Sequence, residues 1–460
     1  MNVAANFCKH YKGAKFEDFS PEEIYRAKIR LLDCVGLMSM GYTAAGNDIL
    51  FEIINDMGGK EEATMVSYGK KVPAMNAAMM NSALVRSYDF EPVEAEGKNH
   101  ARGAAHISSV TIPTALAVAE AEQSDGKKML TALILGDDTV SRVAIAGDSN
   151  PFDSFWDNTG TFNAFGAAVI AGYLMDLDEE QMRNAMGLVV NQMGGSVGNI
   201  FTKKLAFKLP GAVTARNGIF SAALAKKGFD ALDDPLAGKG GYFDIYCNKW
   251  SQEVLLEDLG KVFYADAAVK AHASCRSTHA PIDTAVEIHD KYAPDLEKIK
   301  KIVLHITPIQ LKSFVGGGYS LGPIPQISGA FSLRFTVINA LVRGSLRPEH
   351  YTTEKMSEPI IVDLLEKLEL VGDLDASLGA VAASDLEVFM NDGTVYTSSA
   401  RDALGDIYFK PLTEDKILEK YYANIAFGGK LTKEDADRVR DIVMRIEELD
   451  DVSKMMRILA

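Results

Sequence analysis

The chain has 460 residues, of which 47% are hydrophobic and 24% are charged, and it carries a formal net charge of −15 at pH 7. This composition is that of a globular protein and excludes a disordered or low-complexity chain, and the length predicts two or three domains. Because Lys and Arg form no basic stripe, neither nucleic acid nor an anionic membrane is expected as a partner. A small anionic substrate is not excluded, since a cleft can be locally positive.

Cysteine usage and the apolar segments predict a cytoplasmic protein without disulfides. The four cysteines are few and scattered for so long a chain, which is typical of a reducing compartment. No signal peptide is expected, because no continuous apolar segment follows the first charges. Residues 158–175 and 184–201 are uncharged and reach membrane length, but small and polar residues dilute both. We interpret them as buried helices, not as membrane spans.

The first half of the chain predicts helices almost throughout. Ser20 is a typical N-cap, and Pro21, Glu22 and Glu23 suit the first turn that follows it. Further helices are expected at residues 75–85, 112–121, 129–146, 162–175, 179–192 and 212–227. Because these segments are rich in Ala and Gly and are apolar on most faces, they predict a large helical bundle.

Strand signals appear in the second half of the chain. Residues 298–307 have the pattern of a strand, and residues 386–390 and 394–398 flank Asn391–Gly393, which predicts a β-hairpin. Further helices are expected at residues 277–289, 329–342, 357–367, 413–426 and 432–449.

The expected fold class is therefore mainly α with a smaller α+β domain. We expect a large helical-bundle domain over residues 1–265 and an inserted α+β lid domain over residues 266–405. The C-terminal helices over residues 406–460 are expected to return to the helical domain.

Three segments are candidates for chemistry, and the first contains Asp89, Glu91, His100 and His106. It places several acids and two histidines in a loop between apolar helices. Histidine is the side chain best suited to move protons near neutral pH. The alternative is a solvated loop whose acids cap helices and whose histidines are merely structural.

The second segment holds three lysines, Lys203, Lys204 and Lys208, which interrupt the most apolar part of the chain. Lysines rarely point into a core unless they are paired or functional, and a lysine beside a cleft binds carboxylate as a point charge. The alternative is a loop at the edge of the bundle whose lysines reach out to solvent.

The third segment runs from Lys270 to His279 and includes His272, Cys275 and Arg276. The spacing of His272, Cys275 and His279 permits a metal site. However, Lys270 and Arg276 repel a cation, and an anion would gain from the N-terminus of the helix that follows. We therefore favour carboxylate binding over a metal.

The order of these segments resembles that of the MmgE/PrpD family. The residues that carry the resemblance are Leu31–Asp33 with Gly36, Asp89–Phe90, His106–Ser108 to Ile112–Pro113, Thr159–Thr161 to Gly166–Ala168, Lys203 to Gly218, Lys270 to Asp283, and Ala330–Ser332. The resemblance spans nearly the whole chain, and it is the shared order of the motifs that makes it specific.

The resemblance implies a homodimer with a cofactor-free site between a helical domain and an α+β lid, and no metal is expected because Lys270 and Arg276 repel a cation. It also implies a small carboxylate substrate. By matching position, the catalytic residues would be Asp89, His106, Lys204 and Lys270, with Lys208 as the second choice for the lysine. His106 would move a proton, Asp89 would orient it or act as its partner, and the lysines and Arg276 would hold carboxylates. Further substrate-binding residues would be Asp157, Lys208, Cys275, Arg276, His279 and Phe335.

The chain departs from the family pattern at several of these positions. Glu91–Val93 replaces the usual Asp-Asp-Thr, Asp157–Asn158 replaces His-Pro, and Phe335 replaces a tyrosine; the loop before His106 is also longer. These changes argue against cis-aconitate decarboxylase and predict a smaller or less charged substrate.

The expected activity is dehydration of a hydroxy-di- or tricarboxylate by proton abstraction next to a carboxylate, with epimerisation of an imino- or hydroxy-dicarboxylate as the alternative. Rivals from other classes are a metal-dependent hydrolase built on His272, Cys275 and His279, and an inactive scaffold.

Overall fold

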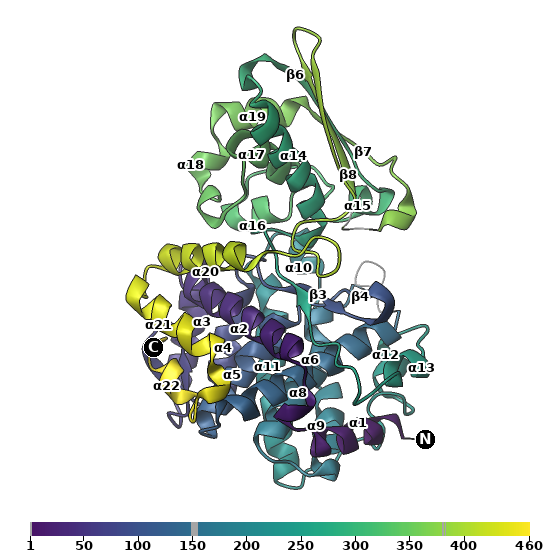
Figure 1. Ribbon diagram of the computed structural model, residues 1–460, viewed down its shortest axis with the longest axis vertical. Coiled ribbons are helices and arrows are strands. Elements are labelled where there is room, and N and C mark those ends of the chain that lie inside the picture. Colours follow the sequence, from purple (N-terminus) through teal and green to yellow (C-terminus); the bar gives the residue numbers. More distant parts are fainter. Residues whose placement is uncertain (1, 149–154, 380, 382) are drawn as a thin grey trace.

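The computed structural model describes residues 2–148, 155–379, 381 and 383–460, which form a helical body and a smaller α+β body (Figure 1). The predicted fold class, mainly α with a smaller α+β domain, is confirmed. The helices of the first half are α1 (Val3–Gly13), α2 (Pro21–Gly41), α3 (Asn47–Met57), α4 (Ala74–Arg86), α5 (Ser108–Ala121), α6 (Gly126–Ala146), α8 (Asn163–Leu174), α9 (Glu179–Val190), α10 (Gly198–Phe201), α11 (Leu209–Lys226), α12 (Tyr242–Tyr246) and α13 (Gln252–Leu256).

Small residues let the central helices α5, α8 and α11 pack closely. A Cβ atom at Gly218 would lie 2.3 Å from the Ala167 side chain, so glycine is required where α11 crosses α8. The predicted start of α2 is confirmed: the Ser20 side chain accepts a hydrogen bond from the Glu23 backbone, and Pro21 occupies the first turn. Helix α5 begins at Ser108, earlier than expected, so that Pro113 lies inside it.

The two uncharged segments fold differently from each other. Residues 158–175 contain the buried helix α8, as expected, whereas the second segment is helical only to Val190 and again in α10. Within the described part of the chain, no helix has both the length and the apolar character that a bilayer-spanning segment requires.

The α+β body is built on a four-stranded sheet with the order β7-β6-β8-β9. Strand β6 pairs parallel with β7 and antiparallel with β8, and the predicted hairpin at Asn391–Gly393 joins β8 to β9. Helices α14, α17 and α19 lie on one side of this sheet (Figure 1). The elements are α14 (His279–Tyr292), β6 (Ile299–His305), α15 (Pro308–Lys312), α16 (Pro325–Ala330), α17 (Leu333–Arg343), α18 (Thr353–Met356), α19 (Pro359–Lys367), β7 (Leu368–Val371), β8 (Ser384–Met390) and β9 (Val395–Ala400).

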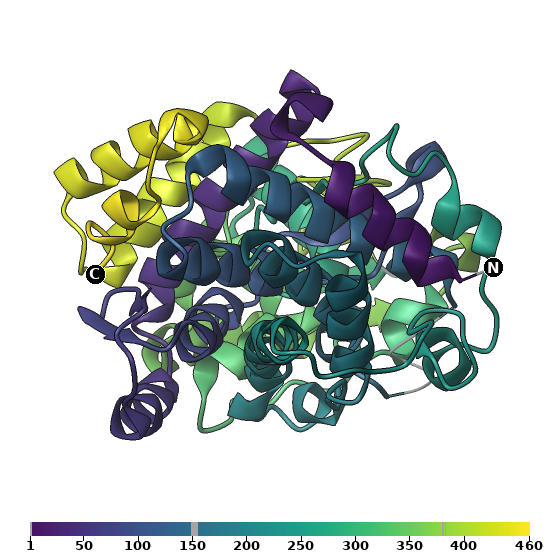
Figure 2. The same cartoon turned by 90° about the horizontal axis from the view of Figure 1, so that it is seen from below.

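The chain then returns to the helical body, where α20 (Glu414–Gly428) and α21 (Lys433–Met444) pack on α2, and α22 (Ser453–Met456) packs on α5. Figure 2 shows these helices at one side of the helical body and the N-terminus at the other. A second hairpin in this body pairs β1 (Ala63–Met65) with β2 (Lys70–Val72).

A short sheet lies where the two bodies meet. Its strands are β3 (Val93–Glu96), β4 (Arg102–Gly103) and β5 (Ala267–Ala268), in the order β4-β3-β5. Because β5 pairs with β3, the chain that follows β5 runs past the loop that precedes β3. This pairing brings Lys270 to Asp89, although the two residues are far apart in sequence.

Candidate active site

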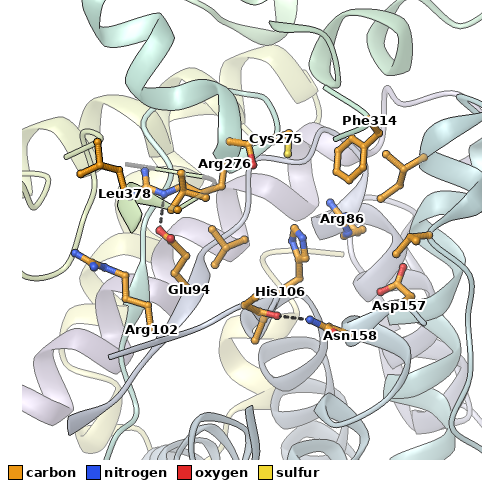
Figure 3. Close-up of a pocket in the computed structure, with 18 residues that line it drawn as sticks. Arg86, Glu94, Arg102, His106, Asp157, Asn158, Cys275, Arg276, Phe314 and Leu378 are labelled. Atoms are coloured by element: carbon orange, nitrogen blue, oxygen red, sulfur yellow. Dashed lines mark hydrogen bonds and ion pairs between the residues drawn. The ribbon is translucent and has the colours of Figure 1, made fainter. Parts of the chain in front are cut away.

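A cavity of about 510 Å³ lies between the two bodies. Four of the predicted site residues line it: His106 and Asp157 from the helical body, and Cys275 and Arg276 from the start of the α+β body (Figure 3). The other lining residues are Arg86, Val93, Glu94, Arg102, Ala104, Ala105, Asn158, Val197, Ile200, Ser277, Phe314, Leu378, Gly379 and Val381.

The His106 imidazole is held by a buried carboxylate. Its Nδ1 lies 2.7 Å from Oε1 of Glu91, whose side chain is fully buried, while 28% of the His106 side chain is exposed. Among the described residues, Nε2 of His106 has no hydrogen-bond partner. The ring is therefore fixed at one nitrogen and accessible at the other.

The charge on Glu91 decides which nitrogen of His106 carries the proton. Burial opposes ionisation of Glu91, but the positive charges of Arg86 and Lys270 outweigh it and lower the pKa of this carboxyl below its ordinary value. An ionised Glu91 accepts a hydrogen bond from Nδ1–H of His106. The lone pair of Nε2 then faces the cavity, which is the arrangement of a general base.

Asp89 lies near His106 and forms the centre of a buried ion-pair cluster. Its carboxylate contacts the Arg86 guanidinium and lies 3.2 Å from Nζ of Lys270, which also donates a 2.6 Å hydrogen bond to the Asp89 carbonyl. Burial raises the pKa of Asp89, but Lys270 and Arg86 together lower it well below its ordinary value. The backbone of Asp89 is left-handed, with φ of 51°, a conformation that costs energy in a non-glycine residue.

Of the two carboxylates, Glu91 is the closer to His106. Oδ1 of Asp89 lies 3.9 Å from Nδ1 of His106, too far for a hydrogen bond, whereas Oε1 of Glu91 lies within hydrogen-bond distance. The geometry therefore gives Glu91 the contact that sequence reasoning had assigned to Asp89.

One group in the described part of the chain has the geometry to hold a metal ion, namely Asp89, Glu91 and His106, whose ligand atoms lie within 4.8 Å of one another. Arg86 and Lys270 already supply two positive charges to these carboxylates. A cation would have to compete with both, so the donor set fits proton transfer better than metal binding. His272, Cys275 and His279 do not converge in this way, and His272 instead pairs with Asp283 at 2.8 Å.

Comparison with known sequences identifies the family. The sequence model of the MmgE/PrpD N-terminal domain matches residues 5–254, and that of the MmgE/PrpD C-terminal domain matches residues 272–448. This chain belongs to the MmgE/PrpD family. It is 22% identical to a cis-aconitate decarboxylase from Aspergillus terreus over 481 residues, which cover 99% of this chain and 96% of the relative. It is also 22% identical to the cis-aconitate decarboxylase-like protein oryM from Aspergillus oryzae, over 100% of this chain and 97% of that protein.

The lysines that the family resemblance nominated do not line the cavity. Lys204 is exposed, and Lys208 is buried outside the cavity lining, where its Nζ donates to the Ala45 carbonyl at 2.8 Å and to Oγ of Ser87 at 3.3 Å. Burial lowers the pKa of Lys208 to about 7. Lys270 also lies behind the cavity wall and reaches the site through Asp89.

His279 and Phe335 lie behind the cavity wall too. Nδ1 of His279 is 3.4 Å from the Arg276 guanidinium, and burial, together with the charges of His272 and Arg276, holds the pKa of His279 far below its ordinary value. Phe335 is buried in α17, where its ring lies 5.8 Å from that of Tyr319. The aromatic ring at this family position packs the α+β body and does not face the cavity.

Asp157, Cys275 and Arg276, the other substrate-binding residues that the family resemblance nominated, do line the cavity. Arg276 donates from Nε to Glu94 at 2.6 Å and from Nη1 to the Leu404 carbonyl at 2.9 Å. Burial raises the pKa of the Cys275 thiol to about 11, so this thiol stays protonated at neutral pH. Asp157 faces the cavity while one of its oxygens accepts a 2.8 Å hydrogen bond from the Thr159 backbone. Both readings of Asp157, as a cavity residue and as a helix cap, therefore apply.

Arg86 and Arg102 were not among the residues singled out from the sequence, and Glu94 was one of the acids of the first candidate segment but was given no role in the site. Each left a signal, since Arg86 is the lone charge in the apolar helix α4, and Glu94 and Arg102 lie in the acid-rich loop that is longer than the family pattern. Arg102 pairs with Asp406 at 2.6 Å, and its guanidinium lies over the rings of Tyr408 and Phe409. These contacts fasten the longer loop to the segment that follows the α+β body.

Proposed function

We propose that this chain is a lyase of the MmgE/PrpD type that removes water from a small hydroxy-dicarboxylate, taking a proton from the carbon next to a carboxylate. The observation that carries the proposal is the Glu91–His106 pair, which leaves Nε2 of His106 open to the cavity. The membership of the family, whose named relatives act on a carboxylic acid, agrees with this choice of substrate class.

In the first step, Nε2 of His106 takes the proton, and the electron pair left on carbon delocalises into the adjacent carboxylate. Guanidinium N–H groups that have no partner in the described part of the protein stabilise the negative charge that develops on this carboxylate. Among the described residues, Nη2 of Arg276 and Nη1 of Arg102 have no hydrogen-bond partner, and both side chains line the cavity.

In the second step, the electron pair forms a carbon–carbon double bond and expels the hydroxyl group of the neighbouring carbon. His106 returns its proton to this hydroxyl, which leaves as water. The sum of the two steps consumes no other reagent, and His106 ends in the form in which it began.

The charges around the cavity favour a dicarboxylate over a tricarboxylate. Four positive side chains face five carboxylates: Arg86, Arg102, Lys270 and Arg276 against Asp89, Glu91, Glu94, Asp157 and Asp406. Each added carboxylate of the substrate would have to be desolvated without a free counter-charge. This argument weighs against cis-aconitate, the acid named for the relatives, because it carries three carboxylates.

A second candidate is epimerisation of an imino- or hydroxy-dicarboxylate, and Cys275 favours it. In Figure 3 this residue comes from the α+β body, above His106. Its protonated thiol could return a proton to the face opposite His106, while His106 keeps the proton it removed. Proton exchange with solvent would then reset both groups.

The test is a panel of hydroxy-dicarboxylates in deuterated buffer, followed by ultraviolet absorbance of the new double bond and by NMR for deuterium uptake. His106→Gln should lower kcat by ~10²–10⁴, because Gln cannot exchange a proton. His100→Gln is the matched control: His100 lies in the same loop but is exposed and outside the cavity lining, so kcat should not change.

Near-normal turnover by His106→Gln, with thermal denaturation showing an intact fold, would refute the proposal. Deuterium uptake and inversion without a rise in absorbance would instead support the epimerase.

A further inference from the structure

The cavity is larger and more apolar than a four-carbon dicarboxylate requires. Its volume of about 510 Å³ lies in the range of roughly 300–1,000 Å³ that holds drug-sized ligands. Much of the wall is hydrocarbon, and the apolar lining residues are Val93, Ala104, Ala105, Val197, Ile200, Phe314, Leu378 and Val381. A substrate made only of carboxylates and hydroxyls would leave this surface unused.

Three of these residues, Val197, Ile200 and Phe314, line the cavity from both bodies and are called the apolar wall below. Val197 is the N-cap of α10 and Ile200 lies in this helix of the helical body, and Phe314 follows α15 in the α+β body. The ring of Phe201, next to Ile200, lies 5.5 Å from that of Phe314. Phe331 supports Phe314 from behind, at a ring distance of 5.9 Å, so the wall is backed by packed side chains.

Phe314 and the two arginines Arg102 and Arg276 lie on different sides of His106, and the wall that contains Phe314 is called the apolar end below. Figure 3 shows Phe314, Arg86 and Asp157 on one side of His106, and Glu94, Arg102, Arg276 and Leu378 on the opposite side. His106 therefore lies between the apolar end and Arg102 and Arg276.

A second carboxylate has no partner at the apolar end. The Arg86 guanidinium lies on the same side of His106 as Phe314 in Figure 3, but both Asp89 and Glu91 already pair with it. Asp157 would repel a carboxylate placed there. Burying an unpaired charge is costly, whereas burying hydrocarbon against hydrocarbon is favourable.

We propose that the substrate carries a hydrocarbon substituent of several carbons, which lies against Val197, Ile200 and Phe314 while its carboxylate lies toward Arg102 and Arg276. This inference rests on the proposed function, because it places the reacting carbon at His106. The substrate class is thus an alkyl-substituted hydroxy-dicarboxylate.

The experiment uses hydroxy-dicarboxylates that carry hydrogen, methyl, propyl or pentyl. Dissociation constants are measured by calorimetry, and kcat/KM by double-bond absorbance. Both affinity and kcat/KM should rise about three- to fourfold per methylene in the unaltered protein until the wall is covered.

Two variants locate the effect. Val197→Phe fills the apolar end, and Ile200→Ala removes part of its surface, so each should flatten the dependence on chain length. Val362→Phe makes the same enlargement on the exposed face of α19, outside the cavity, and should leave the dependence intact.

Calorimetry separates this inference from the proposed function, because binding is measured whether or not turnover occurs. Affinities that are flat or fall with chain length would overturn the apolar subsite, even if the unsubstituted acid reacts. If affinity rises with chain length and neither Val197→Phe nor Ile200→Ala changes this dependence, the apolar subsite does not lie at Val197 and Ile200. Rising affinity without turnover or deuterium exchange would support the subsite and refute the dehydratase.

Discussion

Replacing Glu91 with Gln should abolish most of the activity while preserving the fold. Glu91 is fully buried, and its Oε1 lies 2.7 Å from Nδ1 of His106. Gln keeps the size of the side chain but removes its charge. The Gln amide can also donate to Nδ1, which would place the imidazole proton on Nε2, the nitrogen that must accept the substrate proton.

The size of the loss follows from the contact. Two unit charges 2.7 Å apart attract by about 6 kcal/mol at an effective dielectric constant of about 20, and desolvation reduces the net value. A hydrogen bond to a charged group contributes about 1.5–3 kcal/mol, or roughly 10- to 150-fold in rate. Inversion of the tautomer raises the loss toward ~10⁴, as in other carboxylate–histidine pairs. We therefore expect kcat to fall by ~10²–10⁴.

The assay is double-bond formation together with deuterium uptake by the substrate, and Glu91→Asp is the control. Asp keeps the negative charge, but its side chain is one methylene shorter, so the carboxylate lies farther from His106. Glu91→Asp should therefore lose less activity than Glu91→Gln. If Glu91→Gln keeps more than about a tenth of the normal kcat with a normal melting temperature, Glu91 does not orient the base.

Three further predictions concern Lys208, metals and assembly. The pKa of Lys208 is about 7 in the folded chain and about 10.5 in the unfolded chain, so the unfolded chain binds more protons between these pH values. The free energy of unfolding of the unaltered protein should therefore rise with pH relative to that of Lys208→Met, by up to about 1.4 kcal/mol per pH unit. A difference in unfolding free energy between the two proteins that stays constant from pH 7 to 9.5 in denaturant titrations would contradict this. Dialysis against EDTA should leave turnover unchanged, because Arg86 and Lys270 already neutralise Asp89 and Glu91, whereas a loss that zinc restores would show a metal centre. Light scattering should give about twice the chain mass of 49.9 kDa, and a monomer at micromolar concentration would exclude the homodimer.

Local chemistry made much of the fold predictable from the sequence. The start of α2 follows from an N-cap and a proline at Ser20 and Pro21, and the β8–β9 turn follows from Asn391–Gly393, because each signal acts within a few residues. The small-residue helices of the bundle were equally clear. The start of α5 was not, since the helix was expected from residue 112 and begins at Ser108.

The site was less predictable because long-range pairing builds it. Lys270 meets Asp89 only because the two-residue strand β5 pairs with β3, and so short a strand leaves no periodic signal. Lys208 ends a 3₁₀ helix (Leu205–Lys208) and donates to the Ala45 carbonyl instead of facing the cavity. The sequence shows three neighbouring lysines, but their directions depend on a turn geometry that it does not specify.

Asp157 gives the sharpest test of whether the substrate contains nitrogen. It lies in the cavity, only 4% exposed, and one oxygen caps the Thr159 backbone. Asp157→Asn keeps an oxygen for this cap and changes only the charge, so the fold should be unaffected. A carboxylate that meets an ammonium or iminium group contributes about 1.5–3 kcal/mol, so Asn should raise KM for amino- or imino-dicarboxylates by roughly 10- to 150-fold. For hydroxy-dicarboxylates the same change removes a repulsion, so KM should fall or stay constant. Opposite shifts for the two substrate classes would show that Asp157 selects between them. An equal shift for both would mean that Asp157 serves the helix cap alone.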